Sequence, residues 1–203
     1  MRSAKTVMAS IGFRAKTGRA IAVVLCGPAG APRVLRRVEV SLTDPEMPAT
    51  GQPYHEVMDL PWARAQIDVQ KTIRLIEKVA VRALAGLIQQ ARSENLTICG
   101  VGIVGAPERN LEKIGNAHIR AHAAEGVLFR KVLETAARKN RVRHRRFEER
   151  TLNEVAASAL AYKTTRLEDL LAALGRPVGR PWRADEKMAA AAAWVTLASF
   201  APG

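Results

Sequence analysis

The order of the apolar segments constrains the fold of this chain more than any single motif does. The segments 7–12 and 19–26 are short and apolar, and the stretch FRAKTG between them contains Thr17-Gly18, which suits a turn. In a third segment, 34–42, apolar residues alternate with charged and polar ones, as in a half-exposed strand. The beginning of the chain therefore predicts three strands in series, an antiparallel meander.

Helices and further strands follow this meander. The stretch 43–54, rich in Pro, Thr and Gly, predicts a loop, and Asp59-Leu60-Pro61 supplies a helix cap and an early-helix proline. One long helix is expected from there, because apolar residues recur at helical spacing as far as Ala91. The remaining predicted elements are a buried strand 96–105, a helix 118–140, a short basic strand 141–147 and helices 151–161, 167–174 and 184–200.

The length and composition indicate one domain. A chain of 203 residues that is 48% hydrophobic can bury a substantial core. We expect a core over residues 1–174, followed by a Pro/Gly connector and final helix over 175–203 that pack on the same domain. Cys26 and Cys99 lie in apolar runs, where buried thiols are expected, and a cytoplasmic location follows. The basic start of the chain is too long for a secretory signal, and no apolar run spans a bilayer, so no membrane partner is expected.

The charge balance points to a polyanionic partner. Lys and Arg number 32 against 19 Asp and Glu, a net charge of +13. Such a surface attracts nucleic acid first of all. The alternative is a generally basic surface without a specific site.

Two stretches of the sequence resemble a known family. SIGFRAKTGRAIAVVL is similar to the first hairpin, and RADEKMAAAAAWVTLA to the last helix, of the resolvase-like branch of the ribonuclease H-like superfold. The resemblance implies an α/β fold in which helices flank a mixed central sheet, a three-strand meander plus parallel strands. Segments 7–12 and 96–105 would then be neighbouring parallel strands. It also implies a nucleic-acid partner and divalent Mg or Mn as cofactor, and, if the chain is an enzyme, a hydrolase of nuclease type.

The sequence departs from this family at its first acidic position. Arg14 stands where the family has its first catalytic Asp. Two-metal hydrolysis needs clustered carboxylates, and an arginine brings positive charge instead. Glu108, Glu149 and Asp185 remain as candidate metal ligands, with Glu148 and Glu186 beside them. The resemblance with this departure implies a nucleic-acid-associated protein with a degenerate or altered nuclease site.

Basic residues near the expected site and in one dense stripe are the candidates for phosphate contacts. The alternative for the stripe is a solvated helix end and edge strand. The predicted nucleic-acid-binding residues are Arg14, Lys16, Arg120, Arg138, Lys139, Arg141, Arg143, Arg145 and Arg146.

A second constellation lies at the start of the helix 118–140. His118, His122 and Glu125 are spaced i, i+4 and i+7, which aligns them on one helix face. Two imidazoles and a carboxylate can ligate a transition metal or serve acid–base catalysis or anion binding; otherwise they form a polar helix start that faces solvent or the loop before it. A second functional hypothesis is therefore a hydrolase or phosphoryl-handling enzyme for a small anionic substrate, in which these three residues act with Glu108.

Two further alternatives remain open. Gly100, Gly102 and Gly105 spell G-x-G-x-x-G, which is found in dinucleotide-binding turns but also where a helix packs closely on a strand. The third functional hypothesis is a non-enzymatic assembly protein that binds an acidic partner or forms a homodimer through its long helix.

Overall fold

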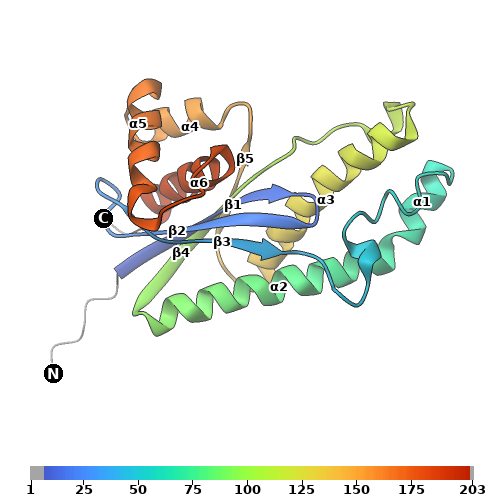
Figure 1. Ribbon diagram of the computed structural model, residues 1–203, viewed down its shortest axis with the longest axis horizontal. Coiled ribbons are helices and arrows are strands. Elements are labelled where there is room, and N and C mark those ends of the chain that lie inside the picture. Colours follow the sequence, from blue (N-terminus) through green and yellow to red (C-terminus); the bar gives the residue numbers. More distant parts are fainter. Residues whose placement is uncertain (1–6, 202–203) are drawn as a thin grey trace.

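The computed structural model describes residues 7–201, which form a five-stranded mixed sheet with helices on both faces (Figure 1). The strand order is β3-β2-β1-β4-β5. The strands are β1 (Val7–Lys16), β2 (Arg19–Cys26), β3 (Arg33–Ser41), β4 (Leu96–Gly105) and β5 (His144–Glu148). The first three strands pair antiparallel, and β4 lies parallel to β1 and β5 parallel to β4. The predicted meander and the parallel pairing of segments 7–12 and 96–105 are confirmed.

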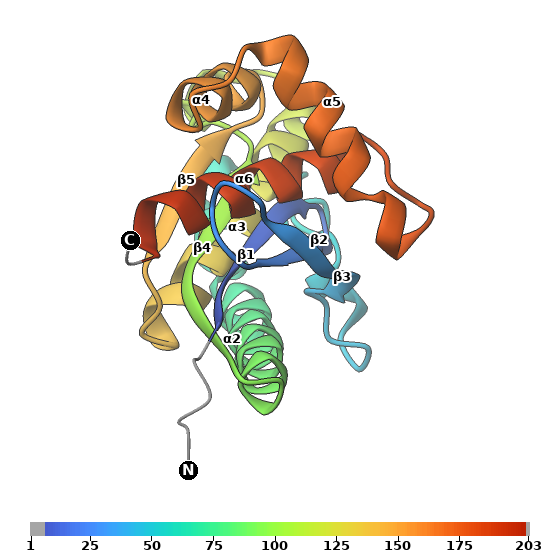
Figure 2. The same ribbon diagram turned by 90° about the vertical axis from the view of Figure 1, so that its left-hand side faces the viewer.

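Residues 7–201 form six α-helices, most of which are layered on the sheet. They are α1 (Trp62–Asp68), α2 (Gln70–Ser93), α3 (Ala117–Lys139), α4 (Leu152–Ala159), α5 (Thr164–Leu174) and α6 (Ala184–Phe200). Three single turns of 3-10 helix lie at Pro48–Thr50, Leu111–Lys113 and Arg176–Val178. Figure 2 shows α2 and α3 on one face of the sheet and α6 on the other, with α4 and α5 outside α6.

Alternation along the strands divides the interior into two cores. On β1, Ile11 and Phe13 pack with the buried sides of α2 and α3, and on β2, Val23 and Leu25 pack on the opposite face with α6. Successive side chains of a strand point to opposite faces, so a strand covered on both sides reads as a continuous apolar run. This explains why β1 and β2 carry almost no exposed residues.

Helix α6 is the central helix of the second core. It lies between the sheet and the pair α4 and α5, so its Ala189–Ala193 run is fully buried and it has no polar face. It approaches the sheet closely because glycines face it. A Cβ on Gly12 would lie 1.8 Å from the Ala189 carbonyl oxygen, and one on Gly102 would lie 2.5 Å from that of Ala192. Close helix packing therefore accounts for Gly102 of the G-x-G-x-x-G sequence.

The structure differs from the predictions at several element boundaries; for example, the basic strand predicted at 141–147 is His144–Glu148, and the helix predicted at 167–174 begins at Thr164. The expected single long helix is divided into α1 and α2 at Val69, which keeps a helical backbone and is buried. The Asp59 side chain does not cap the helix, which begins after Pro61. Strand β1 also continues beyond the predicted 7–12 to Lys16, since Arg14 and Ala15 pair with β2. Arg14 is therefore a strand residue.

Two other expectations concern the interior and the membrane. Cys26 and Cys99 are free and buried, as predicted. Within residues 7–201, no helix combines the length and the apolar character that crossing a bilayer requires.

Candidate functional site

The register between β1 and α6 determines what Arg14 contacts. The Ser10 hydroxyl donates a hydrogen bond to the Ala193 carbonyl at 2.7 Å, and Gly12 faces Ala189. Two strand residues advance about 6.6 Å and four helix residues about 6 Å, so each second residue of β1 meets an α6 residue four positions earlier. The next member of this series pairs Arg14 with Asp185, in the first turn of α6.

Arg14 forms a compact ion-pair group at the carboxyl end of β1. Its Nη2 donates to Glu149 Oε2 at 2.5 Å, and its Nε lies 3.5 Å from Asp185 Oδ1. The Lys16 Nζ lies 3.3 Å from Asp185 Oδ2, and Arg14 Nη1 donates to the Ala15 carbonyl at 2.8 Å. Arg14 is only 7% exposed. We call Arg14, Lys16, Glu149 and Asp185 the Arg14 group.

Glu108 belongs to a different set of charges. It lies 3.3 Å from Arg130 Nη2 and 3.6 Å from both Lys131 Nζ and Arg146 Nη1. Arg130 is fully buried and also donates to Glu134 at 2.6 Å. The hydrogen bond from Arg130 lowers the pKa of the Glu108 carboxyl, and the charge of Lys131 lowers it further. Glu108 is thus held as a carboxylate by three cations.

These carboxylates do not fit a two-metal site. Glu149 and Asp185 both pair with Arg14, and Glu108 pairs with Arg130 and its neighbours. In the range 7–201, these three residues do not form a group whose ligand atoms lie within 4.8 Å of one another. Mg²⁺ and Mn²⁺ are held by carboxylates that are free to coordinate them. These three carboxylates are therefore engaged by cations and are not free to coordinate a metal ion.

The predicted basic residues are divided between the two ends of the sheet. Arg14 and Lys16 lie at the carboxyl end of β1. Arg141 and Arg143 instead line a cleft with Met8, near the amino end of the same strand. Arg14 lies six positions after Met8 on β1, which corresponds to about 20 Å along the strand. Two other predicted residues are already engaged: Arg146 lies beside Glu108, and Arg120 donates to the Ile114 carbonyl at 3.0 Å.

Exposed cations gather where α3 ends and β5 begins. Arg143 donates to the Phe200 carbonyl and lies over its ring, while Arg145 donates to the Ser199 hydroxyl; both partners are neutral. The cleft here has a volume of about 600 Å³ and is also lined by Arg92. We define the amino-end patch as Arg92, Arg138, Lys139, Arg141, Arg143 and Arg145. None of these six forms an ion pair with an acidic residue of the range 7–201.

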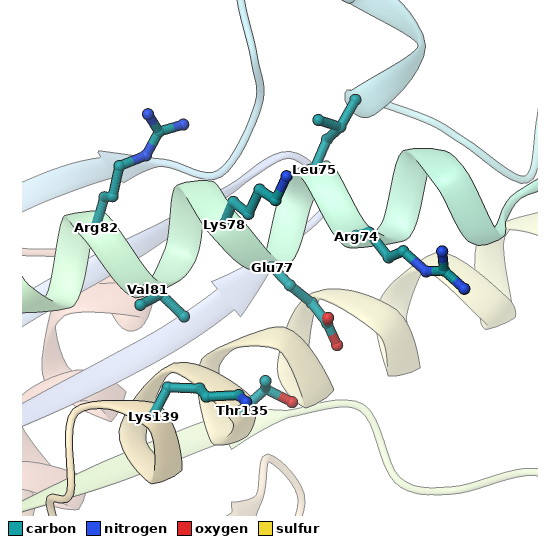
Figure 3. A pocket seen from close by; sticks show the side chains of 8 residues that line it. All are labelled: Arg74, Leu75, Glu77, Lys78, Val81, Arg82, Thr135 and Lys139. Atoms are coloured by element: carbon teal, nitrogen blue, oxygen red, sulfur yellow. The ribbon is translucent and has the colours of Figure 1, made fainter.

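A groove between α2 and α3 continues this basic surface (Figure 3). In Figure 3, Glu77 and Val81 of α2 point toward Thr135 and Lys139 of α3. The groove has a volume of about 740 Å³, and Lys139 belongs both to it and to the amino-end patch. Its other basic residues are Arg74, Lys78 and Arg82.

The histidine constellation is larger than its spacing on the helix predicted. His118 and His122 lie on the exposed face of α3, but Glu125 is fully buried and bonds to His55 of the loop before α1. Sequence reasoning missed His55 because nothing in its surroundings indicates which helix the loop covers. Burial raises the pKa of the neighbouring Tyr54, and the Glu125 charge raises it further. Glu108 is not a member of this cluster.

Comparisons with known proteins agree with the fold. No protein-family model and no curated protein sequence matches the chain. Among solved structures, Thermus thermophilus RuvC in complex with a Holliday junction substrate is 13% identical with a TM-score of 0.50, over 95% of each chain. A second Thermus thermophilus RuvC structure is 14% identical with a TM-score of 0.51, over 95% of this chain and 96% of that one. Together with the strand order and the central α6, these similarities show that the chain has the ribonuclease H-like fold in the arrangement of RuvC.

Proposed function

We propose that this protein binds nucleic acid through the phosphate backbone and that its altered nuclease site does not support metal-dependent cleavage. The observation that carries the proposal is Arg14, whose guanidinium pairs with both Glu149 and Asp185. The RuvC structure with a Holliday junction substrate is consistent with a nucleic-acid partner for this fold. The two free, buried cysteines agree with the cytoplasmic location that we also propose.

The distribution of charge favours the amino-end patch as the contact surface. At the carboxyl end of the sheet, the cations Arg14, Lys16 and Arg130 are each paired with a carboxylate, which leaves little excess charge there. In the amino-end patch, Arg143 and Arg145 bond to neutral groups and keep their charge available. Cations of this kind bind phosphates and release counterions, so affinity depends steeply on salt.

The groove between α2 and α3 extends the same surface. Arg74, Lys78, Arg82 and Lys139 are among its lining residues, with Glu77 as the one acid that lines it. In Figure 3 the side chains of Lys78 and Arg82 point away from α3. A backbone-binding surface of this type positions nucleic acid without reading its sequence.

A homodimer through the long helix stays a prediction, which sedimentation analysis of the free protein tests.

The test is fluorescence-anisotropy binding to single-stranded, duplex and branched DNA and RNA across a salt series. We expect affinity to fall steeply with salt. Replacing Arg138, Lys139 and Arg141 together by Gln should reduce the slope of log affinity against log salt by about 2–3 on duplex DNA, since each phosphate contact contributes about 0.9. The same samples are incubated with Mg²⁺ or Mn²⁺, and no cleavage is expected.

A second triple variant serves as the charge-matched control. Arg166, Arg176 and Arg180 are exposed residues of α5 and the following connector, and their replacement by Gln removes the same net charge. This variant should keep most of the wild-type slope. If both variants lost the same amount of slope, binding would depend on the net charge of the protein and not on the amino-end patch. Metal-dependent cleavage that Asp185→Asn or Glu108→Gln abolishes would overturn the proposed loss of nuclease activity.

A further inference from the structure

Three of the four histidines of the chain converge from two distant segments. His55 comes from the loop before α1, whereas His118 and His122 lie one turn apart at the start of α3. The ring centroids are 4.4 Å apart for His55 and His122, 5.0 Å for His55 and His118, and 4.5 Å for His118 and His122. One nitrogen from each ring lies within 4.8 Å of the other two.

Glu125 determines how His55 faces this cluster. The Glu125 side chain is fully buried, and its Oε1 lies 2.8 Å from His55 Nδ1 and 3.3 Å from the His55 backbone nitrogen. With Glu125 in its carboxylate form, which only accepts hydrogen bonds, Nδ1 of His55 is the donor of this bond. The lone pair of a neutral His55 is then on Nε2. This pairing of a carboxylate with the far nitrogen of an imidazole is typical of zinc-binding histidines.

The Nε2 atom of His55 lacks the hydrogen-bond partner that a buried nitrogen needs. It is buried and has no hydrogen-bond partner among residues 7–201. Buried polar atoms are nearly always satisfied, and an orphaned one requires an explanation such as an ion. A cation bound between His55, His118 and His122 would supply the missing partner. The atom is not exposed to water, and no hydrogen-bond donor of residues 7–201 reaches it.

The separation of the other two nitrogens suits a tetrahedral ion. His118 Nε2 and His122 Nε2 are 3.1 Å apart. Two nitrogens bound to one tetrahedral Zn²⁺ at about 2.0–2.1 Å lie roughly 3.3 Å from each other. A small rotation of the exposed rings therefore opens the required space. Imidazole nitrogens favour Zn²⁺ and similar transition ions over Mg²⁺ and Ca²⁺, which prefer oxygen ligands.

We propose that His55, His118 and His122 bind one Zn²⁺ ion, with Glu125 orienting His55 and a water molecule in the fourth position. Three protein ligands with one open position is the ligand set of catalytic zinc sites. The site is separate from the Arg14 group and involves none of its residues. Because the ligands come from a loop and a helix, the ion also ties the loop before α1 to the start of α3.

The test is metal binding by the full chain, produced without a histidine tag and stripped with a chelator. Zn²⁺ is titrated in by calorimetry, and Co²⁺ is used as a probe whose visible absorption reports tetrahedral coordination. We expect one ion per chain. His118→Gln and His122→Gln, both exposed on α3, should weaken binding by more than about 100-fold, and Glu125→Gln by about 10- to 100-fold as an outer partner.

His144→Gln is the matched control, because His144 is the remaining histidine and lies on β5, outside the cluster. It should bind Zn²⁺ as the wild type does. Circular dichroism verifies that each variant is folded, and the exposed positions of His118 and His122 keep the test valid even if Glu125→Gln unfolds. The proposal is overturned if the folded wild type takes up no Zn²⁺ at tens of micromolar. It is also overturned if His118→Gln and His122→Gln bind like the wild type. Nucleic-acid binding is not part of this measurement, so its outcome is independent of the proposed function.

Discussion

At the residue scale, Arg14 connects three groups at the carboxyl end of β1. Its strand position and its register with α6 direct it toward Asp185, and the guanidinium then also reaches Glu149. A planar guanidinium offers several fixed N–H donors, so Arg14 donates to both Glu149 and the Ala15 carbonyl while its charge also pairs with Asp185. Both carboxylates are thus engaged by a cation of the protein itself.

Arg14→Asp should make stability depend on Mg²⁺. The change places a third carboxylate beside Glu149 and Asp185, and mutual repulsion favours binding of an oxygen-seeking cation. Saturating Mg²⁺ should then stabilise the variant by about 1–3 kcal/mol, as expected for a ligand well above its dissociation constant. Thermal unfolding with EDTA or Mg²⁺ measures this. Arg14→Asn is the neutral control, and Mg²⁺ should change neither its thermal midpoint nor that of the wild type. A similar rise of the midpoint in the wild type and both variants would contradict the prediction.

Glu108 should contribute to stability in a pH-dependent way. Its pKa in the folded protein is lowered, first by the hydrogen bond from Arg130. A lowered folded pKa means that the stabilising effect is present above the unfolded value, about 4.3, and is lost as the pH falls through the folded value. Glu108→Gln should therefore lower the free energy of unfolding at neutral pH, and the difference from the wild type should disappear in strong acid.

Urea unfolding at a series of pH values tests this dependence. Glu112→Gln is the control, since Glu112 is exposed and forms no ion pair among the described residues. It should behave like the wild type at every pH. A Glu108→Gln deficit that stays constant down to strongly acidic pH would show that the lost interaction does not depend on the carboxylate charge.

At the element scale, the contact between α6 and the sheet requires glycine. Gly12→Ala places a methyl group 1.8 Å from the Ala189 carbonyl oxygen, so α6 must move. Overpacking of this kind should destabilise the protein by about 1–3 kcal/mol or more. Gly86→Ala is the matched control, because Gly86 lies within α2 and an added Cβ meets no atom within 4 Å. It should stabilise the protein by about 0.5–1 kcal/mol. Urea denaturation measures the free energy of unfolding, which should fall in Gly12→Ala and rise in Gly86→Ala. An unchanged free energy of unfolding in Gly12→Ala would contradict this packing.

The elements and the pairing of the first strands were largely predictable from the sequence, and the side-chain contacts between distant elements were not. Apolar alternation and helical spacing are local, so the meander, the strand 96–105 and the final helix could all be read from the residues. His55 could not be linked to α3, because that contact joins a loop to a helix far along the chain. The pairing of Arg14 with Glu149 likewise depends on tertiary register, and spacing along the sequence contains no information about it.

At the scale of the whole molecule, positive charge is unevenly balanced. The carboxyl end of the sheet combines cations with nearby acids, as in the Arg14 group and around Glu108. The amino-end patch has no acidic partners within residues 7–201 and adds like charges to a chain of net charge +13. Repulsion within this patch opposes the compact state unless salt or a polyanion screens it.

The thermal midpoint should therefore rise with NaCl, because screening weakens repulsion among exposed charges more than it weakens pairs that include a buried partner, such as Arg14. The triple variant Arg138→Gln, Lys139→Gln, Arg141→Gln should unfold at a higher temperature than the wild type at low salt, and the difference should shrink as salt is added. NaCl is used rather than sulfate or phosphate, which bind basic sites directly.

The triple variant at Arg166, Arg176 and Arg180 removes equal charge from residues spread along α5 and the connector. Its gain at low salt should be smaller, because Coulomb repulsion falls with distance and the three patch residues lie within four positions of one another in the sequence. If both variants gained equally, the instability would come from net charge alone. If the midpoint instead fell with NaCl, ion pairs would dominate the electrostatics of this protein, and its basic patch would not destabilise the fold.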